Sequence, residues 1–131
     1  MITTADLIKI ANERLADAEA LLAANRVDGA AYLCGYAIEI ALKYKLCMTL
    51  SWPGFPQSGS EFEGYRSLKT HDLSVLLSFT GIEGQVKSTH LAEWSALLTW
   101  NPESRYSPSG HISHADATLM INSAKTIIAI L

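Results

Sequence analysis

The sequence predicts an all-α, up-and-down bundle of about five helices, three long and two short, formed by residues 1–131 as a single domain. Apolar residues recur at three- and four-residue steps, which is the period of an amphipathic helix. Strand-like alternation and internal repeats are not seen in the sequence. The 131 residues are 49% hydrophobic and 18% charged, which indicates either a well-filled bundle or an extra apolar face for a partner subunit.

The first long helix is expected over residues 4–24. Thr3 and Asp6 have the spacing of a capping box, with aspartate in place of the usual glutamate or glutamine. The helix then carries one apolar stripe, made of Leu7, Ile10, Ala11, Leu15, Ala18, Leu21 and Leu22. Its opposite face is polar, so we expect it to face solvent.

The second long helix is expected over residues 28–49, with Asp28 as its N-cap. Residues 29–38 are apolar all round, which predicts a central helix buried on every side. Gly35 lies inside this helix, where glycine costs about 1 kcal/mol relative to alanine. We therefore expect Gly35 to mark a close approach between two helices.

The rest of the chain is predicted to hold a long loop at 51–69, short helices at 71–79 and 85–99, a second loop at 101–112 and a last long helix at 113–131. Thr70 and Ser113 are the expected caps of the first and last of these helices. Proline and glycine punctuate both loops. A loop as long as 51–69 is typically functional or mobile.

Charge and cysteine content indicate a cytoplasmic protein. Net charge is −3, so no overall basic character points to nucleic acid. Cys34 and Cys47 are about 20 Å apart along one helix, beyond disulfide reach, which suits a reducing compartment. We expect no signal peptide and no membrane span, because the apolar run 29–42 is too short to cross a bilayer and contains Glu39.

One face of the second helix carries polar side chains at steps of three and four residues, namely Asp28, Tyr32, Tyr36, Glu39 and Lys43. One interpretation is a structural seam in which Glu39 is neutralised by Lys43 or a nearby arginine. The other is the floor of a pocket in which Glu39 holds a catalytic cation. Both interpretations require a basic neighbour for Glu39.

Arg105 and His111 lie just before the last helix and form a candidate catalytic pair. An imidazole can move a proton to or from a ribose oxygen near neutral pH, and a guanidinium can grip the scissile phosphate bidentately. Such a pair cleaves RNA without metal. His71 follows Arg66 at a similar spacing, and we expect it to bond locally at the start of its short helix.

No metal site and no cofactor are predicted. His90, His111 and His114 are close in sequence, but a structural zinc site needs four ligands at defined spacing and no cysteine is nearby. Phosphate-binding glycine loops, nucleophile elbows and paired-carboxylate motifs are not found in the sequence.

Two segments resemble the first two helices of HEPN-domain proteins. They are residues 16–22 (ADAEALL) and residues 28–39 (DGAAYLCGYAIE). The pair Leu42-Lys43 and residues 70–73 (THDL) and 100–106 (WNPESRY) are similar to later blocks of the same family. The resemblance covers most of the chain outside residues 51–66.

The resemblance implies a small helical bundle that forms a two-fold homodimer. Many HEPN domains are metal-independent ribonucleases in which an arginine and a histidine of each subunit meet in a shared cleft. They act as toxins or in phage defence, often beside a nucleotidyltransferase-like partner that neutralises them. By this resemblance Arg105 would bind the phosphate, His111 would be the general acid and base, and Glu39 with Tyr36 would orient Arg105. Tyr32, Lys43, Tyr106 and His71 would complete the pocket.

Three functions stay open. The first is a ribonuclease that acts on RNA, as the toxin of a toxin–antitoxin or phage-defence system. The second is a non-catalytic HEPN module that binds a nucleotide or a partner protein such as the nucleotidyltransferase-like antitoxin. It is kept because Tyr106 follows the arginine where active members carry a polar residue, and because Pro108 and Gly110 keep the segment out of a regular helix. The third is a dimerisation domain without a groove.

Overall fold

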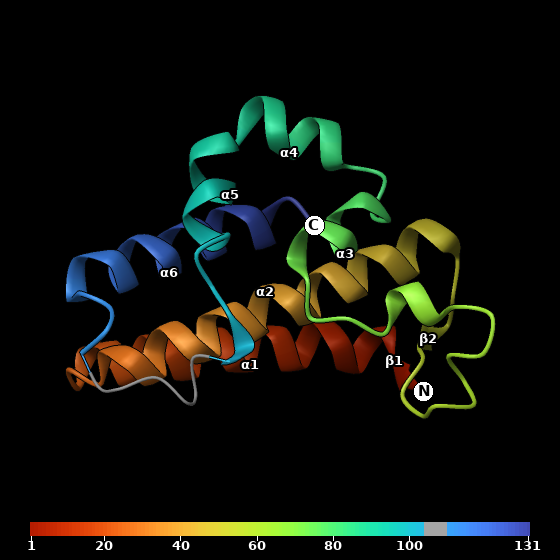
Figure 1. Ribbon diagram of the computed structural model, residues 1–131, viewed down its shortest axis with the longest axis horizontal. Coiled ribbons are helices and arrows are strands. Elements are labelled where there is room, and N and C mark those ends of the chain that lie inside the picture. The colour runs from red at the N-terminus through yellow and green to blue at the C-terminus, as the bar shows by residue number, and fades with distance from the viewer. Residues whose placement is uncertain (104–109) are drawn as a thin grey trace.

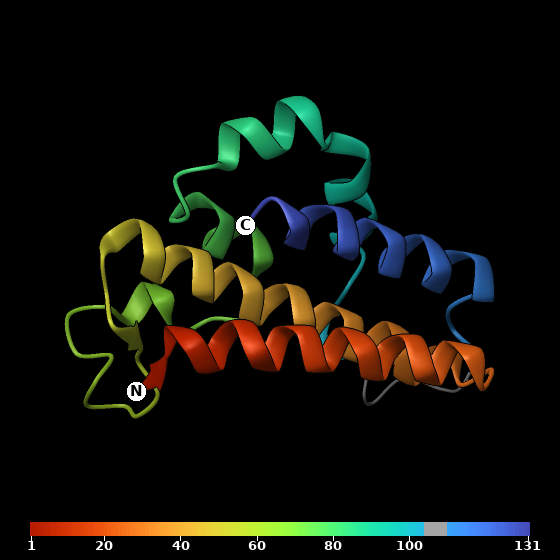
Figure 2. The same ribbon diagram turned by 180° about the vertical axis from the view of Figure 1, so that it is seen from behind.

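Two long antiparallel helices form the base of the molecule, and a third lies across them. A computed structural model describes residues 1–103 and 110–131. Helix α1 (Thr4–Ala23) and helix α2 (Val27–Leu50) lie side by side along most of their length. Helix α6 (His114–Ala129) packs on both and runs in the same sense as α2 (Figures 1 and 2). The predicted all-α bundle is confirmed.

Short helices form an arch between α2 and α6. They are α3 (Leu73–Ser78), α4 (Glu83–Thr89) and α5 (Leu91–Leu97), preceded by the 3-10 turn η1 (Arg66–Leu68). The single helix predicted over 85–99 is therefore wrong. It breaks at His90, whose backbone (φ −129°, ψ 33°) leaves the helical region between α4 and α5.

A two-stranded antiparallel sheet closes one end of the base. Strand β1 (Ile2–Thr3) pairs with β2 (Gly54–Phe55), with Ile2 opposite Phe55 and Thr3 opposite Gly54. This pairing was not predicted, since two residues are too few to show an alternating pattern. The sheet ties the beginning of α1 to the segment that follows α2.

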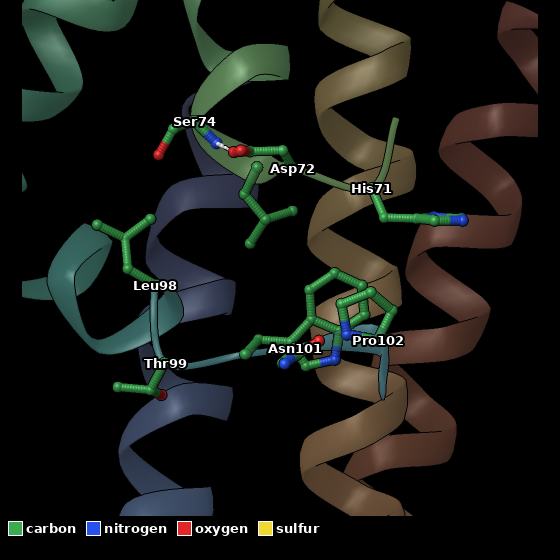
Figure 3. Close-up of a pocket in the computed structure, with 9 residues that line it drawn as sticks. His71, Asp72, Ser74, Leu98, Thr99, Asn101 and Pro102 are labelled. Carbon is green, nitrogen blue, oxygen red and sulfur yellow. Dashed lines mark hydrogen bonds between the residues drawn. The ribbon is translucent and has the colours of Figure 1, made fainter. Parts of the chain in front are cut away.

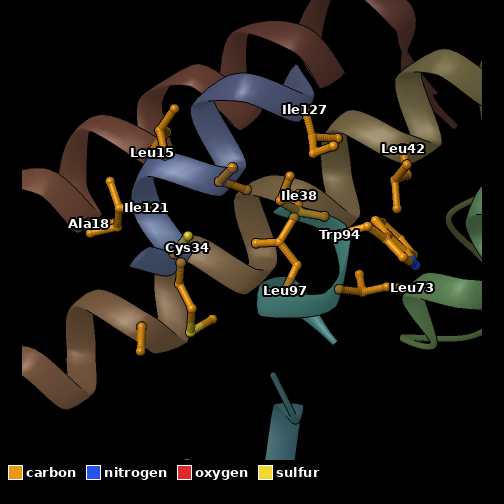
Figure 4. Close-up of a cluster of buried hydrophobic side chains, with 14 of the residues drawn as sticks. Leu15, Ala18, Cys34, Ile38, Leu42, Leu73, Trp94, Leu97, Ile121 and Ile127 are labelled. Atoms are coloured by element: carbon orange, nitrogen blue, oxygen red, sulfur yellow. The ribbon is translucent and has the colours of Figure 1, made fainter. Parts of the chain in front are cut away.

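The main core surrounds α2 (Figure 4). Cys34, Ile38 and Leu42 of α2 are fully buried against apolar side chains from α1, α3, α5 and α6. The prediction that residues 29–38 are buried on every side is only partly right. Gly29 is exposed, and Tyr32, Leu33 and Tyr36 are half-buried. The face that carries the two tyrosines is covered by connecting segments rather than by a helix.

The 51–69 segment builds a second, smaller core of its own. Phe55, Phe62 and Leu68 are buried against Leu46 of α2 and Leu7 of α1. The Phe55 and Phe62 rings meet edge to face, with centroids 5.8 Å apart. The segment is thus anchored by aromatic packing over the C-terminal half of α2.

Helix caps were predicted correctly at two of four places. The side chains of Thr3 and Ser113 each accept from a backbone N–H in the first turn of α1 and α6. The prediction for α2 is wrong, because Arg26 occupies the N-cap position and Asp28 lies within the helix. At α3 the cap is Asp72 rather than Thr70, since Asp72 accepts from the backbone of Ser74 and Val75.

Of the helices in residues 1–103 and 110–131, none combines the length and the apolar character needed to cross a bilayer.

Candidate functional site

The polar face of α2 predicted from the spacing is present, and three connecting segments lie over it. Asp28, Tyr32, Tyr36, Glu39 and Lys43 follow one another along the helix. They are met by the residues around His71 before α3, by Trp100 after α5, and by Gly110 and His111 before α6. All three segments are distant from α2 in the sequence, and the fold brings them together over this face to form one site.

The first end of the face holds an aspartate–histidine pair. Asp28 Oδ2 accepts a 2.8 Å hydrogen bond from the backbone N–H of Gly110, and Asp28 Oδ1 lies 3.4 Å from His111 Nδ1. The positive φ of Gly110, 81°, is a conformation that glycine adopts without strain. The two side chains are 34% and 37% exposed. Asp28 thus fixes the segment that carries His111 and turns Nδ1 of its ring toward the helix.

The middle of the face holds a buried carboxylate with two basic partners. The Glu39 side chain is 4% exposed; its Oε2 lies 3.1 Å from Lys43 Nζ and its Oε1 lies 2.7 Å from His71 Nδ1. The predicted neutralisation of Glu39 by Lys43 is confirmed. The expectation that His71 bonds locally is wrong, because its partner is 32 residues away in sequence.

A set of aromatic rings lies between the Asp28–His111 pair and the Glu39 carboxylate. Tyr36 meets the rings of Tyr32, Trp100 and His71 edge to face at centroid distances of 5.1, 5.0 and 6.1 Å. The Trp100 indole N–H donates a 3.2 Å hydrogen bond to the backbone carbonyl of Tyr32. Offset aromatic contacts of this kind hold rings in fixed orientations.

Gly35 lets Trp100 approach the helix. A Cβ atom at this position would overlap the Trp100 indole ring. The close approach predicted at Gly35 therefore exists, but the partner is the indole of a connecting segment and not a second helix.

Two adjoining pockets open on this face. The larger, of about 580 Å³, lies between the start of α3 and residues 98–102 (Figure 3). Figure 3 shows His71, Asp72 and Ser74 along one edge and Thr99, Asn101 and Pro102 along the other. The smaller, of about 280 Å³, includes Asp28, Tyr32 and His111 in its lining. Thr99, Trp100 and Asn101 line both pockets, so the two form one groove with a histidine at each end.

Two of the predicted site residues, Arg105 and Tyr106, lie outside the described residues. The predicted pairing of Arg105 with His111, and its orientation by Glu39 and Tyr36, therefore stay predictions. His111 lies at the groove beside Asp28. Glu39 is eleven residues farther along α2 than Asp28, which is about 16 Å at 1.5 Å per residue. Both oxygens of Glu39 already have basic partners in Lys43 and His71.

The cysteines take no part in this site. Burial raises the pKa of Cys34 to about 12 and that of Cys47 to about 11, and both residues are fully buried. A thiol at these pKa values is protonated at neutral pH and is a poor nucleophile. In residues 1–103 and 110–131 no three His, Cys, Asp or Glu side chains gather in a way that could hold a metal ion.

The residue spacing predicted the polar face of α2, but it did not predict the parts that Trp100 and His71 play in the site. Trp100 was not among the predicted site residues, although it lines both pockets. The partnership of His71 with Glu39 had no signal in the local sequence, because it depends on how the 51–69 segment returns to α2.

The comparisons with known proteins agree with the resemblance of the first two helices. The family model described as the HEPN domain matches residues 4–51, which contain α1, α2 and the whole polar face. A search of curated proteins and a search of solved structures found no match to this chain.

Proposed function

We propose that this chain, whose residues 4–51 carry the HEPN signature, is a metal-independent ribonuclease in which Arg105 and His111 act on the RNA phosphodiester. The observation that carries the proposal is the Asp28–His111 pair at the rim of the groove. An imidazole beside a carboxylate, partly exposed at the lip of a pocket, is the arrangement expected of a general acid and base.

The chemistry requires one proton to leave and another to arrive. The 2′-oxygen of ribose forms a bond to phosphorus as it loses its proton, and the bond from phosphorus to the 5′-oxygen breaks as that oxygen gains one. His111 takes the proton of the 2′-hydroxyl through Nε2, because Nδ1 is turned toward Asp28, and water supplies the proton that the 5′-oxygen gains. Arg105 would bind the phosphate and stabilise the charge that develops on it. The products are a 2′,3′-cyclic phosphate and a free 5′-hydroxyl.

A homodimer fits this proposal. Leu91, Leu98 and Leu119 are 57%, 48% and 55% exposed, so a second copy would find apolar side chains to cover on α5 and α6. Leu119 and His111 line the same surface pocket. A second copy that covers Leu119 would therefore bring two His111 side chains toward a shared cleft. Light scattering at micromolar concentration tests this, and a Leu119→Glu variant should shift the protein toward monomer.

The test of activity is cleavage of total cellular RNA in EDTA. Arg105→Ala and His111→Ala should each lower the cleavage rate about 10²- to 10⁴-fold without unfolding the protein, because each removes a group that acts in the transition state. His114→Ala is the matched control, since His114 is exposed and its Nδ1 lies 3.4 Å from the Thr118 hydroxyl, in the first turns of α6. Wild-type-like cleavage by both site variants would show that the assignment is wrong.

In a cell, we propose that the protein acts in the cytoplasm as a toxin of a toxin–antitoxin or phage-defence system, silenced by a nucleotidyltransferase-like partner. Induced expression of the wild type should arrest growth. The His111→Ala variant should not.

A non-catalytic module that binds a nucleotide or a partner protein is the second candidate. It is favoured by the acidic residues of the groove, because Asp28, Asp72 and Glu103 line it and would repel a long polyanion. Absence of RNA cleavage by the wild type in EDTA, together with saturable binding of a mononucleotide, would favour this candidate.

A further inference from the structure

The two ends of the groove carry similar chemistry. His71 and His111 both face a carboxylate of α2 through Nδ1, and each lines one of the two adjoining pockets. The two imidazoles differ in how they are held. His71 Nδ1 lies 2.7 Å from a carboxylate that is 4% exposed, although the His71 side chain itself is 59% exposed.

Charge balance alone does not explain His71. Lys43 is 3.1 Å from Glu39 and already supplies one positive charge for this one negative charge. A second basic partner would be surplus in a purely structural pair, and a structural partner would be expected to share the burial of Glu39. Asp72, the next residue in the sequence, has Oδ1 engaged by the backbone N–H groups of Ser74 and Val75. Glu39 thus holds an exposed ring in a fixed orientation, with Nε2 as its outer nitrogen.

The pocket next to His71 contains groups of the types that bind nucleotides, beside an acidic residue, Asp72, whose Oδ1 is already engaged by backbone N–H groups. Trp100 supplies an aromatic side chain, while Ser74, Thr99 and Asn101 supply neutral hydroxyl and amide groups. Single-stranded RNA is bound by just these group types, which contact bases and ribose, together with basic groups that contact phosphate. A volume of about 580 Å³ lies within the range of small-molecule sites.

We propose that the pocket beside His71 is a second nucleotide subsite, in which His71 Nε2 donates a hydrogen bond to a phosphate of the RNA outside the scissile position. The proposal rests on the ribonuclease function proposed above. Residues 99–101 form a wall common to both pockets, so one RNA strand runs from His111 past Trp100 to His71. Glu39 is then a positioning residue for substrate binding, and His71 sets affinity rather than the rate of the chemical step.

The test uses a fluorescent single-stranded oligonucleotide that is 2′-O-methylated throughout, because it lacks the attacking hydroxyl and stays intact. Anisotropy at pH 6 gives its Kd for the wild type, His71→Ala, His71→Gln and the control His114→Ala. We expect His71→Ala to weaken binding about tenfold, as for loss of one charge-assisted hydrogen bond. His71→Gln should fall between His71→Ala and the wild type, since it keeps a neutral donor, and His114→Ala should match the wild type.

The salt dependence of Kd separates a phosphate contact from a structural effect. Loss of one phosphate contact should reduce the slope of log Kd against log salt concentration by about 0.7, the value for single strands. A merely structural role would weaken binding without changing the slope. In cleavage assays of unmodified RNA, His71→Ala should raise KM with kcat nearly unchanged.

The outcomes are distinguishable from those of the activity test. If the wild type binds the oligonucleotide and His71→Ala lowers both affinity and slope while no RNA is cleaved, the subsite stands and the ribonuclease proposal fails. An unchanged Kd and slope in His71→Ala would overturn the subsite even where cleavage by His111 is established. Failure of the wild type to bind would overturn it as well.

Discussion

The two histidine–carboxylate pairs on α2 use the same residue types in opposite environments. At one end Asp28 and His111 are each about one-third exposed and lie 3.4 Å apart. In the middle Glu39 is nearly inaccessible, lies 2.7 Å from His71 and has Lys43 as a second partner. The difference between the two pairs is therefore one of burial, and burial determines how much a pair can contribute to stability.

A carboxylate held out of water must be compensated, because desolvation costs several kcal/mol unless charged partners and hydrogen bonds offset it. Glu39 has both, and so it orders the segment that brings His71 back to α2. A half-exposed pair contributes little to stability, since water screens it. Loss of the Asp28–His111 pair is therefore expected to disturb the fold little.

The largest loss of stability is expected when Glu39 is replaced. Glu39→Ala leaves Lys43 and His71 facing one another without their carboxylate, which should lower the free energy of unfolding by about 2–3 kcal/mol. Urea unfolding followed by circular dichroism measures it. The matched control is Glu83→Ala, which removes an exposed pair with Lys87 (3.3 Å) and should cost less than about 0.5 kcal/mol. Equal losses in the two variants would mean that burial at Glu39 has no special weight.

An intermediate effect is expected where the aromatic rings join the two pairs. Gly35→Ala forces the Trp100 indole outward, and the strain should exceed the gain in helix propensity by about 1–2 kcal/mol. Displacement of Trp100 removes the wall that both pockets share. Tryptophan fluorescence should shift toward the red and RNA binding should weaken. The control is Gly84→Ala in α4, where a Cβ meets no atom within 4 Å; a red shift in this control would contradict the explanation.

The smallest effect on stability is expected at the exposed end. Asp28→Asn keeps an acceptor for the Gly110 N–H and removes the charge beside His111. The free energy of unfolding should therefore change by less than about 1 kcal/mol. Cleavage should fall more steeply than stability, because the imidazole loses the group that orients it. A loss of stability as large as that of Glu39→Ala would show that the two pairs are not different in kind.

Much of this fold was predictable because the spacing of apolar residues in the local sequence indicates long amphipathic helices. The ranges 4–24, 28–49 and 113–131 agree with α1, α2 and α6 to within a few residues, and the polar face of α2 followed from its spacing. The break at His90 and the pairing of Ile2 with Phe55 escaped prediction, since both depend on tertiary contacts and involve very few residues. The same holds for His71, whose capping context suggested a local bond whereas its carboxylate lies across the fold.

The protection of Cys34 and Cys47 has a practical consequence for the study of the groove. Both thiols are shielded from solvent and stay protonated well above neutral pH, so maleimides should leave the folded protein unmodified. A cysteine introduced at an exposed site such as Ser95 would then be the single point of attachment in each chain. Spin labels or dye pairs placed there would report the distance between two copies in solution, with no need to replace the native cysteines.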